Sequence, residues 1–110
     1  MAYTIERALD DKLIELVNRN DDLGIYKFRV GVLDTIVTVE IGRLPASERA
    51  RYHRSHDIKT PSQAGPYHQS RYDWDDVPYA LFQAINSITS YYRMGLEDGH
   101  TPDESWLVET

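Results

Sequence analysis

The residues best suited to bind a ligand lie in one segment near the middle of the chain. Positions 49–61 concentrate arginine, histidine, lysine and tyrosine side chains. Guanidinium and ammonium groups donate charge-assisted hydrogen bonds to phosphate or carboxylate, and histidines add positive charge at mildly acidic pH. We therefore expect residues of about 49–72 to bind an acidic protein surface or a small anion. The residues expected to line this site are Arg51, Tyr52, His53, Arg54, His56, Lys59, Tyr67, Arg71 and Tyr72.

The same segment has two other interpretations. Its tyrosines could stack on nucleic-acid bases, but the formal net charge of −6 repels phosphate at long range, so we do not expect a nucleic-acid partner. His53 and His56 could share one face of a helix and bind a metal, with His68 or Asp57 as a third ligand. Two histidines alone do not complete a metal site. We expect no metal and no cofactor.

An enzyme is the main alternative to a binding module. It would use His56 or His100 as a general acid or base in a pocket covered by the long loop. The chain contains no nucleophile elbow, phosphate-binding glycine loop, zinc-protease motif or dinucleotide fingerprint. We therefore favour a non-enzymatic function and name no catalytic residue.

Charge is distributed unevenly along the chain. Residues 42–72 carry six basic and two acidic side chains, whereas residues 73–110 carry one basic and eight acidic ones. Such asymmetry bears on which partners the protein can attract and says little about its fold. Two outcomes are open: the basic segment faces a partner, or it packs against acidic residues of its own chain.

The acidic C-terminal third has its own alternative interpretation. A surface of carboxylates can imitate nucleic-acid phosphates and bind the basic groove of a nucleic-acid enzyme, as small inhibitors from mobile elements do. The simpler interpretation is helix capping and a solvated tail. The residues concerned are Asp73, Asp75, Asp76, Glu97, Asp98, Asp103, Glu104 and Glu109.

The length and composition are typical of a globular protein. The chain has 110 residues, 41% of them hydrophobic and 27% charged, which suits one domain over residues 1–110. It has no cysteine, which excludes disulfides, a thiol nucleophile and cysteine-ligated zinc. No apolar run is long enough to span a membrane, and the N-terminus does not have the pattern of a signal peptide. We expect a soluble cytoplasmic protein.

Hydrophobic periodicity predicts a helix and then a β-hairpin in the first part of the chain. Apolar residues recur every three or four positions over 4–20, with Thr4 as the N-cap, although Ile14 does not fit this face. A period of two follows over 25–32 and again over 35–41. The short link between these strands predicts a hairpin, and Gly31 could mark a bulge.

The second part predicts a long helix after an irregular segment. Pro45 to Tyr52 suggests a short helix, and residues 55–72 read as a loop held down by tyrosines. Apolar spacing from Val77 to about Leu96, after a cluster of aspartates, predicts the central core helix. The tail at 104–108 could dock as a third strand on the hairpin.

These elements predict a single α+β domain with its helices on one face of the sheet. In chain order the elements are helix, β-hairpin, irregular basic segment with a short helix, long core helix and docked tail. The exposed hairpin edges favour self-association, most simply as a two-fold homodimer that extends the sheet or buries the tyrosines.

Overall fold

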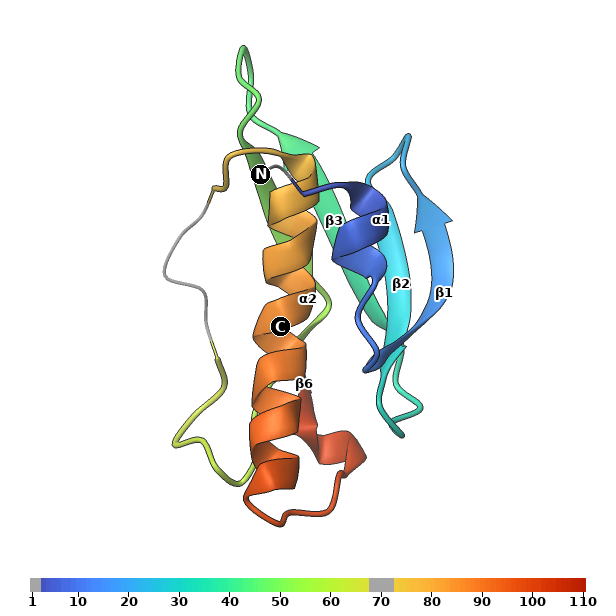
Figure 1. Cartoon of the computed structure of the whole chain (residues 1–110). Helices are drawn as coiled ribbons and strands as arrows, with labels where there is room; N and C mark the ends of the chain where they lie inside the picture. The colour runs from blue at the N-terminus through green and yellow to red at the C-terminus, as the bar shows by residue number, and fades with distance from the viewer. Residues whose placement is uncertain (1–2, 68–72) are drawn as a thin grey trace.

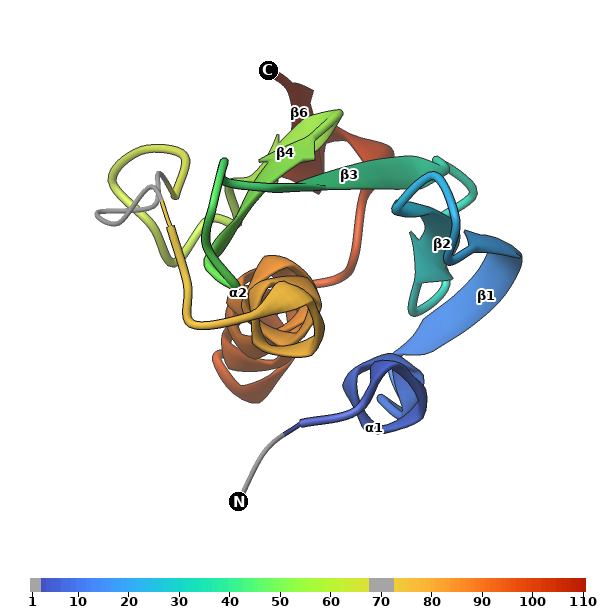
Figure 2. The same cartoon turned by 90° about the horizontal axis from the view of Figure 1, so that it is seen from above.

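The chain folds into an α+β structure, as predicted. A computed structural model describes residues 3–67 and 73–110. A four-stranded antiparallel sheet has the strand order β1-β2-β3-β4, and β5 pairs with β6 in a second, two-stranded sheet. Helices α1 and α2 lie together on the concave side of the larger sheet (Figures 1 and 2). The elements are α1 (Ile5–Leu9), β1 (Ile14–Asn20), β2 (Ile25–Val30), β3 (Val37–Arg43), β4 (Ala50–Arg54), β5 (His56–Ile58), α2 (Val77–Glu97), a 3-10 turn (Glu104–Trp106) and β6 (Leu107–Glu109).

The predicted N-terminal helix over 4–20 is wrong beyond its first turns. Thr4 caps α1 as expected, because its hydroxyl accepts a hydrogen bond from the Arg7 amide. The chain then turns and continues as β1, which pairs with β2. The register shifts between Leu16 and Asn18, so the strand contains a bulge at that point. This bulge brings apolar residues to helix-like spacings and hides the period of two.

The predicted hairpin is confirmed. β2 and β3 pair antiparallel, with Tyr26 opposite Val39 and Phe28 opposite Val37. These side chains are fully buried under the helices. Gly31 lies in the turn after β2 with a φ of 54°, not in a bulge of the strand.

The predicted short helix over 45–52 is replaced by a turn and strand β4. Ala46 has a φ of 56°, which is outside the right-handed helical region. β4 adds to the sheet beside β3, with Ile41 opposite Tyr52 and Glu40 opposite His53. The basic segment is therefore an edge strand for part of its length, and its side chains alternate between the two faces of the sheet.

The predicted core helix is confirmed as α2. Asp76 is its N-cap and accepts a hydrogen bond from the Tyr79 amide, and Pro78 lies in the first turn. One face of α2 packs on β3, β4 and α1. The largest fully buried side chains of the core are Tyr26, Tyr92, Phe28, Ile58, Leu81, Ile85 and Ile88.

The C-terminal tail docks on the fold, but not on the hairpin. β6 pairs with β5, with Ile58 opposite Leu107. β1 and β4 occupy the two edges of that hairpin. Among the residues that the structure describes, neither helix is long and apolar enough to cross a membrane.

Candidate functional site

The predicted site residues on β4 separate to opposite faces of the sheet. Arg51 and His53 are exposed on the outer face, away from α2. Tyr52 and Arg54 are buried on the inner face. A strand directs successive side chains to opposite sides, so the side chains of Tyr52 and Arg54 face away from those of Arg51 and His53.

Arg54 is held inside the protein. Its side chain is 3% exposed, and Nη2 donates to Asp57 Oδ1 at 3.0 Å. Nη1 donates to the Ala84 carbonyl oxygen of α2 at 2.9 Å and to the Ser87 hydroxyl. The guanidinium therefore ties β4 and β5 to the long helix. The expectation that Arg54 belongs to an exposed surface does not hold.

The tyrosines of the segment that the structure describes pack internally. The Tyr52 ring lies 5.4 Å from the Arg54 guanidinium carbon, and burial raises the pKa of the Tyr52 hydroxyl. The Tyr67 ring lies 5.9 Å from the same carbon and 5.2 Å from the Tyr91 ring. Tyr67 thus holds down the loop after β5, as the loop interpretation expected.

His56 and Lys59 are only partly exposed. His56 Nδ1 lies 2.7 Å from the Ser55 hydroxyl oxygen, and its residue faces Glu109 across the small sheet. The Lys59 amide donates to the Trp106 carbonyl oxygen at 2.8 Å. The predicted residues His68, Arg71 and Tyr72 lie outside the described residues.

The basic segment is neutralised by internal acids only in part. Arg49 Nε lies 2.8 Å from Asp73 Oδ2, and Arg49 Nη1 lies 3.3 Å from Asp75 Oδ1. Arg54 pairs with Asp57 inside the segment itself. Within residues 3–67 and 73–110, Arg51 forms no ion pair.

Two other acids of the C-terminal third, Glu104 and Asp98, have structural contacts elsewhere. Glu104 accepts hydrogen bonds from the amides of Asp34 and Thr35 and from the Thr35 hydroxyl. Asp98 accepts from the Ser62 hydroxyl at 2.5 Å. These carboxylates fasten loops to the fold. They contribute nothing to neutralising Arg51 and do not favour the interpretation as a phosphate mimic.

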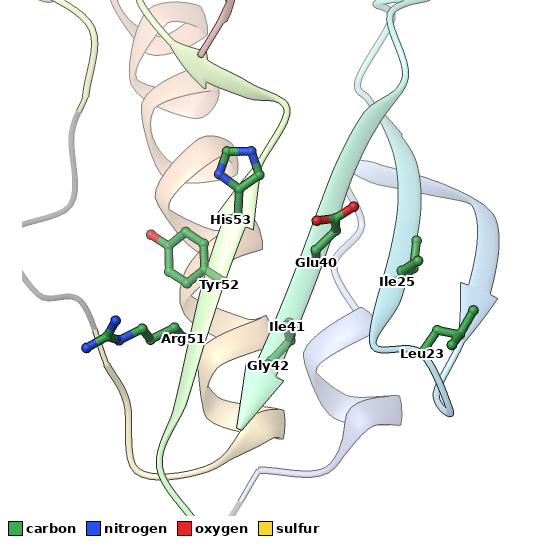
Figure 3. A pocket seen from close by; sticks show the side chains of 8 residues that line it. All are labelled: Leu23, Ile25, Glu40, Ile41, Gly42, Arg51, Tyr52 and His53. Atoms are coloured by element: carbon green, nitrogen blue, oxygen red, sulfur yellow. The ribbon is translucent and has the colours of Figure 1, made fainter. Parts of the chain in front are cut away.

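A shallow hollow of about 580 Å³ lies on the outer face of the sheet, and we call it the sheet hollow (Figure 3). Gly42 lies opposite Arg51 in the strand register, and Glu40 lies opposite His53. A Cβ at Gly42 would meet no atom within 4 Å, so the missing side chain leaves open space there. The hollow is lined by Leu23, Ile25, Glu40, Ile41, Gly42, Arg51, Tyr52 and His53.

The sheet hollow combines an apolar side with a basic side. Leu23 is 67% exposed at the β1–β2 turn, and Ile25 stands beside it at the start of β2. Arg51 and His53 lie on β4 at the opposite side, and Figure 3 shows the Arg51 side chain extending away from β3. Such an arrangement can bind a carboxylate that is attached to an apolar group, through charge on one side and burial on the other.

The positions of the histidines offer little support for catalysis or for metal binding. The sheet hollow contains His53, but neither His56 nor His100, which the enzyme alternative required. His53 and His56 lie on different strands and not on one helical face. The described part of the chain contains no group of three histidine, aspartate or glutamate side chains placed to hold a metal ion.

Sequence reasoning missed the residues that β2, β3 and the β1–β2 turn contribute to the hollow. Glu40 and Gly42 occupy outward-facing positions of the second hairpin strand. The alternation of that strand could have placed both residues on the outer face. Their partners could not be assigned because β4 was expected to be a helix. Leu23 lies between the predicted helix over 4–20 and the predicted strand over 25–32, so the periodicity assigned it to no element.

Comparisons with models of known protein families, with curated proteins and with solved structures found no match.

Proposed function

We propose that the protein is a non-enzymatic binding module whose sheet hollow holds an acidic side chain of a protein partner. The single observation that carries this proposal is Arg51. Its guanidinium is exposed and forms no ion pair among the described residues, and its backbone lies opposite Gly42, whose missing side chain leaves open space. Arginine binds carboxylates through two parallel hydrogen bonds. A glutamate or aspartate next to an apolar residue fits the two sides of the hollow.

Glu40 makes the hollow selective. Its carboxylate lies opposite His53 in the register and shares the hollow with Arg51. A ligand with dense negative charge would be repelled by Glu40, whereas a single carboxylate can approach the Arg51 side. For this reason we favour an acidic peptide segment over a small polyanion such as phosphate. No cofactor enters this proposal, and a cytoplasmic location remains a prediction from composition.

The experiment is a titration of the isotopically labelled protein followed by amide NMR. The probe is a short unstructured peptide with one glutamate next to a leucine, compared with the same peptide carrying glutamine for glutamate. We expect the glutamate peptide to shift the amides of Gly42, Arg51 and His53 and the glutamine peptide to leave them in place. Inorganic phosphate is a third probe and should shift them less.

Two variants and one control sharpen this test. Arg51→Ala should weaken binding of the glutamate peptide by roughly tenfold or more, because a charge-assisted pair is lost. Gly42→Val places a side chain in the hollow without disfavouring the strand, and it should also weaken binding of the glutamate peptide. Arg93→Ala removes the same charge from the exposed end of α2 and should change nothing. Equal effects of Arg51→Ala and Arg93→Ala would show general attraction and contradict the proposed site.

A further inference from the structure

Helix α2 has an outer face without charge. From Val77 to Tyr92 the sequence contains no aspartate, glutamate, lysine or arginine. The inner face of this stretch is buried against the sheet and α1. On the side of α2 away from β3 and β4, the views show no described helix or strand (Figure 2). A surface helix ordinarily carries charged residues on such a side.

The residues of this outer face form what we call the uncharged stripe. They recur at spacings of three and four along the helix, and each is partly exposed. The side chains of Gln83, Asn86 and Ser90 make no hydrogen bond or ion pair to another described residue. The stripe consists of Tyr79, Phe82, Gln83, Asn86 and Ser90.

The composition of the uncharged stripe matches a protein interface. Interface centres are depleted of charged residues and enriched in aromatic ones. Tyr79 and Phe82 form the aromatic end, where the Tyr3 ring stacks on Phe82 with its centroid 4.3 Å away. Asn86 and Ser90 are small enough to let another helix approach closely, and both can donate and accept hydrogen bonds.

The geometry points to a second copy of this chain as the occupant of the stripe. Residues close to a two-fold axis lie near their own counterparts, so a charge there meets a like charge. The chain has a formal net charge of −6, and other exposed faces carry charged side chains such as Glu15 on β1 and Glu40 on β3. The uncharged stripe can face itself without this repulsion, and its amides and hydroxyl can pair across the axis.

The dimer that this contact predicts is weak and reversible. The stripe extends over about 17 Å of helix, because each residue advances the helix by roughly 1.5 Å. A contact of this length between two helices belongs to the smaller class of interfaces, which form transient complexes. The surface is separate from the sheet hollow, so dimerisation and peptide binding can be tested independently.

The test measures mass by sedimentation and light scattering across a concentration series up to roughly 500 µM, where transient dimers populate. We expect the wild type to move from one chain to two, and Asn86→Lys to stay at one chain with an unchanged circular dichroism spectrum. Asn18→Lys is the matched control: it adds the same charge on the exposed side of β1 and should leave the dimer intact.

A charge-reversal mixture makes the test specific for the stripe. Asn86→Glu and Asn86→Lys should each weaken the dimer by roughly tenfold or more, because Asn86 lies near the middle of the stripe. An equal mixture of the two should restore it as a heterodimer. Three results would overturn the inference. They are a wild type that remains one chain throughout, an Asn86→Lys variant that still dimerises, and an Asn18→Lys variant that dissociates, because that last result would place the contact on the β1 edge.

Discussion

The hydroxyl group of Tyr92 occupies the space beside Gly31 in which any other residue would carry its Cβ. A Cβ at Gly31 would lie 2.1 Å from the Tyr92 oxygen, and the φ of Gly31 is 54°. The Val32 amide donates to the same hydroxyl at 3.3 Å. Tyr92 is 2% exposed, so the ring has little room to withdraw. The turn after β2 and the far end of α2 therefore fit together only through a glycine.

We predict that Gly31→Ala lowers the free energy of unfolding by about 2–4 kcal/mol. About 1 kcal/mol comes from placing alanine at positive φ, and the rest from overpacking against the ring. Gly99→Ala is the matched control, because Gly99 has a φ of 86° but open space around it, and it should cost only about 1 kcal/mol. Denaturant unfolding gives both values. If the two variants lower the free energy of unfolding by the same amount, overpacking against the Tyr92 ring adds nothing to the effect of Gly31→Ala.

A double variant tests the contact with the Tyr92 side chain. Tyr92→Leu removes the hydroxyl and the ring carbons that a Cβ at Gly31 would meet. We expect Gly31→Ala to cost less in the Tyr92→Leu background than in the wild type, since residues in contact are not additive. A strictly additive result in denaturant unfolding would contradict the close approach.

The buried guanidinium of Arg54 should matter more for stability than its exposed neighbour on the strand. Arg54→Met removes the buried guanidinium that donates to Asp57, to the Ala84 carbonyl oxygen and to the Ser87 hydroxyl, and should lower the free energy of unfolding by about 2–4 kcal/mol. Arg51→Met, three positions earlier on the outer face, should change it by less than about 0.5 kcal/mol. Equal costs in denaturant unfolding would contradict the different placement of the two arginines.

The carboxylate of Glu104 links the C-terminal tail to the β2–β3 turn in a pH-dependent way. The Thr35 hydroxyl and the amides of Asp34 and Thr35 hold the pKa of Glu104 below its usual 4.5. The pKa of Glu104 is lower in the folded protein than in the unfolded chain. The carboxylate therefore gives its full stabilisation at any pH above its pKa in the unfolded chain. That contribution is lost as pH falls through the folded pKa.

Glu104→Gln should therefore lower the melting temperature at neutral pH, and the difference from wild type should shrink as the pH falls below about 4.5. Glu109→Gln is the control, because the Glu109 side chain accepts no hydrogen bond from another described residue. Melting curves from pH 7 to pH 3 check the prediction. A constant difference across that range would contradict it.

The sequence predicts the elements of this fold whose hydrophobic pattern is unbroken. β2, β3 and α2 each keep one period along their length, and the structure contains all three. β1 was missed because a bulge near Val17 interrupts its alternation. β4 was missed because one of its inward positions holds Arg54, a charged residue where the pattern requires an apolar one.

The candidate site was less predictable than the fold because it depends on strand pairing. Arg51 and His53 were chosen from residue type alone, and the structure places both on the outer face. Gly42 and Glu40 became relevant only once β4 paired with β3. Which of several arginines would be buried depends on contacts between segments distant in sequence, such as Arg54 with Ser87. Local periodicity does not contain that information.

The last prediction concerns Tyr26, whose ring is fully buried and whose hydroxyl donates to Asp21 Oδ1 at 3.0 Å. Burial and this hydrogen bond raise the pKa of Tyr26 to about 12. The folded state favours the neutral phenol, so its contribution to stability is complete below pH 10 and is lost as pH rises toward 12. In an ultraviolet titration of tyrosinate, Tyr26→Phe should remove the absorbance that appears only above the ordinary tyrosine pKa of 10, toward pH 12. Asp21→Asn should move the Tyr26 step to lower pH, because the neutral amide no longer opposes the phenolate. Loss of an early step in Tyr26→Phe would show that this hydroxyl is accessible and that the contact with Asp21 does not hold it.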